Sequence, residues 1–66
     1  MQIILNGNVM LFDTAPTISE LLQRTGNAGR RVAVEVNRTI IPRSEHGTRC
    51  VADGDSVEIV TALGGG

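Results

Sequence analysis

The chain has 66 residues, 41% of them hydrophobic, one aromatic side chain (Phe12) and a formal net charge of −1. A chain of this length forms one domain with a thin core, which leaves little room for a substrate cleft on the order of several hundred Å³. Its scattered charges form neither a nucleic-acid footprint nor a polybasic membrane patch. The apolar run at residues 3–5 is too short for a signal sequence or a membrane span, so we expect a soluble cytoplasmic protein.

Alternating apolar residues and turn signals predict five β-strands. Asn6-Gly7 is the dipeptide that most strongly favours a two-residue hairpin turn, because both residues tolerate positive φ, and Asn37-Arg38 also fits a tight turn. Pro42 confines its strand to a sheet edge or a strand end. An irregular or single-turn crossing over residues 43–49 and a turn at 53–55 lead to the last strand. The predicted strands span residues 2–5, 9–12, 31–36, 39–42 and 56–61.

One helix is predicted over residues 18–23, between the second and third strands. Residues 17–20 have the spacing of a capping box, in which Thr17 accepts from the amide of Glu20 while Glu20 reaches back. Gly26 is suited to terminate the helix in a left-handed conformation. The apolar stripe consists of Ile18, Leu21 and Leu22. We expect the helix to pack on one face of a mixed sheet. If it forms a right-handed crossover, the last strand can lie in the middle of the sheet, parallel to the first. The predicted fold is α+β and β-grasp-like.

The end of the chain, Leu63 followed by Gly64, Gly65 and Gly66, is the most informative stretch for function. A last strand at the centre of the sheet would anchor the chain up to about residue 61. We therefore expect a domain of residues 1–61 followed by a flexible tail of residues 62–66. Three extended glycines span on the order of 10 Å and can pass a bare backbone and its carboxylate into a narrow channel on another protein. The alternative is an ordinary frayed terminus. We expect Leu63 at the mouth of that channel, the alternative being a contact with its own domain.

Several segments, taken together in chain order, resemble one protein family, and the resemblance covers the whole chain. They are the hairpin around Asn6-Gly7, residues 17–22, 32–37, 41–43, 53–55 and 57–60, and the terminal glycines. Together they resemble the ThiS family, the sulfur carriers of bacterial thiamin biosynthesis. Many members end in two glycines, whereas this chain ends in three. The resemblance implies a ubiquitin-like β-grasp fold and a carrier whose reacting carboxylate lies on Gly66, with Gly64 and Gly65 threading into partner active sites.

The resemblance also implies a chemistry and a set of partners. A carboxylate is a poor electrophile, and in this family an E1-like (ThiF-like) adenylyltransferase uses ATP to convert it into an acyl-adenylate. Sulfur from a persulfide donor such as a cysteine desulfurase then displaces AMP and leaves a terminal thiocarboxylate. A ThiG-like thiazole synthase would accept that sulfur. The chain would therefore be a co-substrate rather than an enzyme, with no catalytic residue, no metal and no bound cofactor.

Other polar residues have simpler structural interpretations. Cys50 could relay sulfur, but a lone cysteine beside valine and alanine is more often a small buried hydrophobe. His46 could be a base, but a lone histidine in a polar loop is usually solvated. Asp53 and Asp55 resemble a fragment of a Ca²⁺ loop, yet no further ligands follow at the required spacing, so we predict a turn.

Two other function classes stay open from the sequence. One is another ubiquitin-like sulfur carrier or modifier, such as the molybdopterin-synthase small subunit, which would use the same tail chemistry on a different acceptor. The other is a non-covalent β-grasp interaction module. A module of that kind has no reason to stop at a glycine carboxylate.

Overall fold

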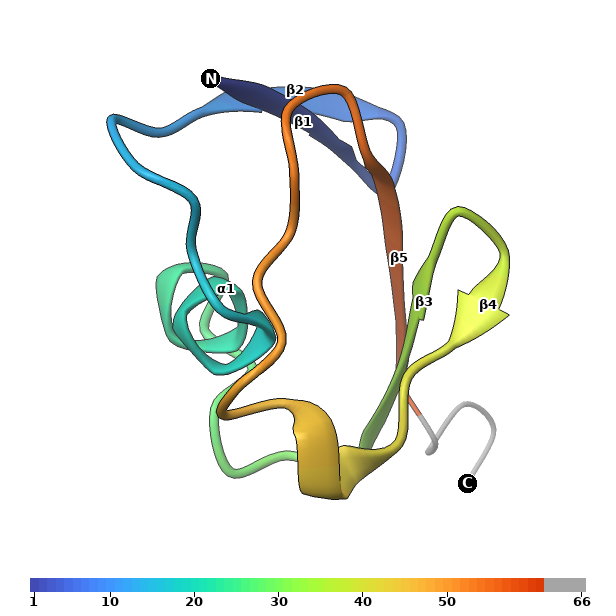
Figure 1. Cartoon of the computed structure of the whole chain (residues 1–66). Coiled ribbons are helices and arrows are strands. Elements are labelled where there is room, and N and C mark those ends of the chain that lie inside the picture. Colours follow the sequence, from blue (N-terminus) through green and yellow to red (C-terminus); the bar gives the residue numbers. More distant parts are fainter. Residues whose placement is uncertain (62–66) are drawn as a thin grey trace.

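The computed structural model describes residues 1–61, in which the predicted order of two strands, a helix, two strands and a final strand is confirmed (Figure 1). The elements are β1 (Gln2–Leu5), β2 (Asn8–Leu11), α1 (Ile18–Arg24), β3 (Val32–Val36), β4 (Thr39–Ile40), the 3-10 helix η1 (Arg43–Glu45) and β5 (Ser56–Thr61). The expected flexible tail at residues 62–66 lies outside the described residues. No helix within residues 1–61 is both long enough and apolar enough to cross a membrane.

The five strands form one mixed sheet in the order β2-β1-β5-β3-β4. The central strand β5 is parallel to β1, with Ile4 opposite Ser56, and antiparallel to β3, with Val32 opposite Thr61. This arrangement confirms the prediction that the last strand lies in the middle beside the first. Helix α1 and the segment that leads into β5 lie on one side of the sheet (Figure 1).

Both hairpin turns use the positive φ values that their sequences predict. Asn6 and Gly7 have φ values of 49° and 85°, and Asn37 and Arg38 have values of 49° and 71°. Two consecutive residues with positive φ give a turn whose twist matches that of the flanking strands. Because the first turn contains two residues, Leu5 pairs directly with Asn8. Strand β2 therefore begins and ends one residue earlier than predicted.

The helix is capped as its sequence predicts. Thr17 and Glu20 form the complete capping box. The Thr25 hydroxyl donates to the carbonyl of Leu21 at 2.9 Å, and Gly26 ends the helix with a φ of 76°. The last turn closes around Thr25, so α1 extends one residue beyond the predicted end.

The core lies between α1 and the inner face of the sheet. Alternation along each strand decides which side chains enter it, because successive residues point to opposite faces. The buried apolar residues are Ile3, Leu5, Phe12, Ile18, Leu21, Leu22, Val34, Val36, Ile41, Val51, Val57 and Ile59. Strand β4 is shorter than predicted. Ile41 still donates its amide to Val34, but Pro42 has no amide hydrogen to continue the ladder.

Two asparagine side chains hold β5 in place beyond its regular pairing. Strand β1 ends at Leu5, but the amide group of Asn6 continues the ladder: its Oδ1 accepts from the Ile59 amide at 2.8 Å, and its Nδ2 donates to the Ile59 carbonyl at 3.3 Å. At the start of β5, Asn37 Oδ1 accepts from the Ser56 amide at 2.9 Å. Side chains from both hairpin turns thus stabilise the central strand.

We expect Asn6→Gly to lower the midpoint of thermal unfolding by several degrees. Glycine keeps the positive φ, so the loss of stability measures the two hydrogen bonds to Ile59, which are worth about 1 kcal/mol each. A change of about 1 kcal/mol shifts the melting temperature of a small domain by roughly 4–8 °C. The Ile59 amide should also exchange faster than in the wild type, in which β1 and β5 contain the slowest amides. The control is Asn8→Gly, the same change at an exposed position of β2. Equal losses in both variants, or the slowest exchange at residues 39–41, would contradict this account.

Candidate functional site

The site predicted from the sequence begins where β5 ends. Thr61, the last described residue, pairs with Val32 at one end of the sheet. The predicted docking residue Leu63, the threading residues Gly64 and Gly65, and the reacting residue Gly66 lie outside the described residues. Five residues separate Thr61 from the end of the sequence and span at most about 18 Å. Any protein that binds residue 66 must therefore also lie close to this end of the sheet.

The sheet face opposite α1 carries all the large exposed hydrophobic side chains of the described chain. Along β5, Val57 and Ile59 point into the core, so Glu58 and Val60 point outward. The pairing register places the outward residues of the neighbouring strands on the same face. The exposed hydrophobic residues there are Val9, Leu11, Ile40 and Val60, each at least half exposed. We call this surface the open face.

A pair of carboxylates interrupts the apolar surface of the open face. Glu35 of β3 lies directly opposite Glu58 of β5. Together with Arg38 they border a hollow of about 380 Å³, whose lining residues are Glu35, Asn37, Arg38, Ser56 and Glu58. Neither glutamate stands out in the sequence, because each alone looks like an ordinary solvent-facing residue of an alternating strand.

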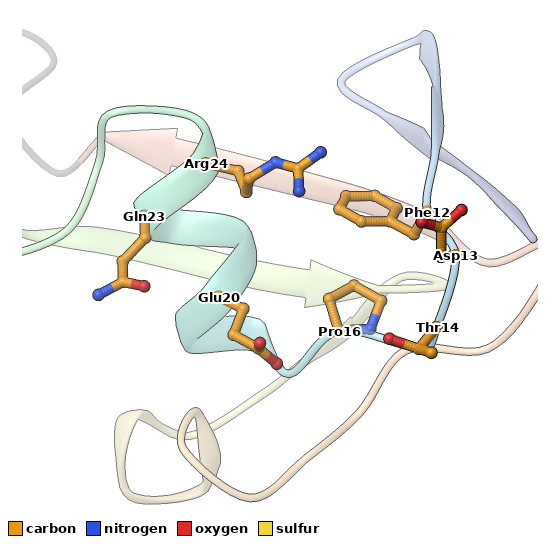
Figure 2. A pocket seen from close by; sticks show the side chains of 7 residues that line it. All are labelled: Phe12, Asp13, Thr14, Pro16, Glu20, Gln23 and Arg24. Carbon is orange, nitrogen blue, oxygen red and sulfur yellow. The ribbon is translucent and has the colours of Figure 1, made fainter.

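A second hollow lies beside α1, on the other side of the molecule from the open face. Figure 2 shows its lining residues, which are Phe12, Asp13, Thr14, Pro16, Glu20, Gln23 and Arg24. Two of its charged groups already have structural partners. Glu20 accepts from the Thr17 amide at 2.8 Å, and the Arg24 guanidinium lies 4.9 Å from the centre of the Phe12 ring. This hollow thus lies between α1 and the segment that precedes it, and we assign it no chemistry.

The structure corrects the interpretations of Cys50 and His46. Cys50 is exposed rather than buried, and its backbone forms an isolated antiparallel bridge with Thr17. His46 is only 7% exposed rather than solvated, because the turn of η1 directs it inward. Its Nε2 lies 3.0 Å from the carbonyl of Ile41 and must donate, since a carbonyl only accepts. His46 therefore anchors the crossing segment.

Asp53 and Asp55 form a turn, as predicted. The carboxylate of Asp55 accepts from the Ala52 amide at 2.8 Å, which closes the turn, and that of Asp53 accepts from the Gln2 amide at 2.7 Å. Within residues 1–61, no group of three or more histidine, cysteine or acidic side chains is placed to hold a metal ion. Both aspartates thus attach the loop before β5 to its neighbours.

Comparison with known proteins decides the family. Residues 3–66 match the model of the ThiS family. The chain belongs to this family. The ThiS-family chain is 30% identical to the sulfur carrier protein ThiS of Escherichia coli, with both chains covered completely. It is also 41% and 35% identical over all its residues to thiazole synthases of Paramagnetospirillum magneticum and Magnetococcus marinus, but it spans only 20% of each of those proteins.

Solved structures confirm the fold of the ThiS-family chain. The crystal structure of a ThiS thiamine biosynthesis protein from Geobacter metallireducens covers the whole chain with a TM-score of 0.82 at 33% identity. The solution structure of a thiamine biosynthesis protein from the same organism gives a TM-score of 0.75. The β-grasp prediction and the family resemblance are thereby both confirmed.

Because Cys50 is exposed, its thiol should react with Ellman's reagent in the folded protein at close to the rate measured in denaturant. Absorbance of the released thiolate measures both rates. Cys50→Ser should abolish the signal and leave the melting temperature within about 1 °C, as expected for a surface change near neutral in stability. A reaction that is seen only after unfolding would show that the thiol is buried.

Proposed function

We propose that the chain is a cytoplasmic sulfur carrier that donates sulfur for thiazole formation in thiamin biosynthesis and is not itself a catalyst. The observation that carries this proposal is the position of β5, a central strand with neighbours on both sides that leads directly into Ala-Leu-Gly-Gly-Gly. Membership of the ThiS family supports it, as does the full-length similarity to the sulfur carrier of Escherichia coli.

The chemistry would take place at the carboxylate of Gly66. A carboxylate oxygen attacks the α-phosphorus of ATP on an E1-like, ThiF-like adenylyltransferase, which forms the acyl-adenylate and releases pyrophosphate. The terminal sulfur of a persulfide donor, such as a cysteine desulfurase, then attacks the carbonyl carbon and AMP leaves. A second thiol cleaves the resulting S–S bond and becomes part of a disulfide, which supplies the two electrons. The product is a C-terminal thiocarboxylate.

The acceptor would be a ThiG-like thiazole synthase, which takes the sulfur and returns the carrier as a carboxylate. Two thiazole synthases contain a segment similar to this whole chain, which supports a working association between the two kinds of protein. ATP is used by the activating enzyme, and we assign the carrier no bound cofactor.

The terminal glycines would allow the end of the chain to enter a narrow active site on a partner enzyme. A site that excludes water around an acyl-adenylate has little space for a Cβ, and the approach of a bare backbone can use φ values that other residues resist. The carrier would thus present its reacting group without side chains around it. Recognition would then rest on Leu63 and on the surface of residues 1–61.

Gly65→Ala and Gly66→Ala should sharply reduce sulfur loading without changing the melting temperature, because the added methyl group obstructs the partner's channel rather than the fold. The readout is intact mass after incubation with the adenylyltransferase, ATP and a persulfide donor. The wild type should gain the mass difference between sulfur and oxygen at its C-terminus.

A chain that ends at Gly65 serves as the control for the third glycine. If it gains sulfur as well as the wild type, the reacting residue is Gly65 and the carrier role remains. If neither chain gains sulfur with an adenylyltransferase that is active on another carrier, the proposed function is wrong.

Leu63→Asp should weaken binding to the adenylyltransferase while the melting temperature stays unchanged. A charged side chain at the mouth of an apolar channel would have to be desolvated, which typically costs more than about 1 kcal/mol. Calorimetry with the purified enzyme measures the affinity, and Ala62→Asp is the matched control one residue nearer the domain. A large loss of stability with retained binding would instead indicate that Leu63 packs on its own domain.

A further inference from the structure

Three basic side chains line a third hollow, which has a volume of about 280 Å³ and lies where the loop after α1 passes η1 (Figure 1). Its lining residues are Leu22, Gly29, Arg30, Val32, Arg43 and His46. Among the described residues that line it, none is acidic. The chain as a whole carries a formal net charge of −1, so the hollow concentrates positive charge in a slightly acidic protein.

His46 forms the buried wall of this hollow. The residue is only 7% exposed, and its Nε2 donates to the carbonyl of Ile41 at 3.0 Å. Within residues 1–61 the other ring nitrogen, Nδ1, has no such partner, and no unpartnered side-chain nitrogen there is fully enclosed. Nδ1 therefore opens to the surface, where a ligand can reach it. When the ring is protonated, Nδ1 carries a hydrogen and donates.

The two arginines come from backbone turns that are themselves hydrogen-bonded. Arg30 closes a turn by donating its amide to the Asn27 carbonyl at 3.0 Å. Arg43 begins η1, and its carbonyl accepts from the His46 amide at 3.1 Å. Both arginines are exposed. Because a guanidinium presents its N–H donors in a planar fork that matches the oxygens of an anion, the hollow combines two such forks with one ring nitrogen.

We propose that this hollow binds a phosphate group through Arg30, Arg43 and His46. Three separate donor side chains match the three terminal oxygens of a phosphate monoester, whereas a carboxylate offers only two oxygens. Leu22 and Val32 give the hollow an apolar side, against which the organic part of an ester can lie. The inference goes beyond the proposed function, because it concerns an anion bound by the carrier alone and involves no sulfur transfer.

The hollow lies at the end of the sheet where β5 ends. Val32, which lines it, pairs with Thr61, so the site borders the point from which the last five residues continue. Two sources of the phosphate group are chemically suited. One is free phosphate, and the other is a phosphate compound such as the AMP and pyrophosphate that adenylation of a carboxylate would release. All of them present the same tetrahedral, negatively charged group.

A competing explanation is that the arginines are ordinary solvated surface charges. Anions would then associate weakly with every exposed arginine, in proportion to their own charge and without saturation. Arg49 provides the comparison, because it is exposed and is not among the residues that line the hollow. Under the competing explanation, its removal would affect anion binding as much as the removal of Arg30 or Arg43.

The test is a titration of the isotope-labelled full chain with inorganic phosphate, AMP and pyrophosphate in turn, at constant ionic strength, followed by NMR. We expect saturable shifts of the amide signals of residues 29–30 and 43–46, together with a shift of the His46 Nδ1 signal. For a ligand of a few non-hydrogen atoms, the dissociation constant should be on the order of 1 mM. Acetate, titrated in the same way, should bind more weakly.

Variants locate the site. Arg30→Gln and Arg43→Gln should each bind phosphate about 10- to 100-fold more weakly, as for the loss of a hydrogen bond to a charged group, with the melting temperature unchanged. His46→Gln keeps an N–H donor for the Ile41 carbonyl but removes Nδ1, and it should weaken binding as well. Arg49→Gln is the matched control and should bind as the wild type does.

Equal binding of the three phosphate ligands would support recognition of the phosphate group alone, and tighter binding of AMP or pyrophosphate would support the proposal and identify the source. Acetate that binds as tightly as phosphate would overturn the assignment to phosphate. Shifts that do not saturate, or an equal loss in Arg49→Gln, would overturn the site itself. No enzyme takes part in these titrations, so such a failure is distinct from failure of the carrier role, which sulfur loading tests by intact mass.

Discussion

The pairing of β5 on both sides is the constraint on which the rest of the structure depends. A parallel neighbour and an antiparallel neighbour fix the strand at the centre of the sheet. The side-chain amide of Asn6 then extends this support to Ile59, beyond the last residue of β1. The segment after Thr61 thus continues from a central strand, whose last residues, Val60 and Thr61, pair with β3.

The same strand also divides the molecule into two surfaces. Its inward residues, Val57 and Ile59, complete the core against α1, while Glu58 and Val60 lie on the open face. An uncovered apolar sheet face favours self-association unless charges interrupt it. Glu35 and Glu58, which lie opposite each other on β3 and β5, provide such an interruption on this face.

Local signals in the sequence were sufficient for the elements and their order. The turn at Asn6-Gly7, the capping box of Thr17 and Glu20, and the alternation of β5 each depend on residues close together in the chain. Burial in the crossing segment depends instead on long-range packing. His46 lies in the interior, where its carbonyl accepts from the Ser19 amide at 2.9 Å, a contact between distant segments that no local pattern encodes. The pairing of Glu35 with Glu58 likewise required the register of two strands separated in sequence.

The glycine tail itself limits where recognition can reside. In the proposed function, Gly64, Gly65 and Gly66 would present only backbone groups and the Gly66 carboxylate, which any carrier ending in glycines would present in the same way. Discrimination between partners is a difference of binding free energies and needs side chains that differ from one carrier to another. Within the described part of the chain, the exposed side chain of Val60 on the open face directly precedes Thr61, the last described residue. In the proposed function, selection of the activating enzyme would therefore depend on side chains outside the glycines, and the glycines would contribute the chemistry common to such carriers.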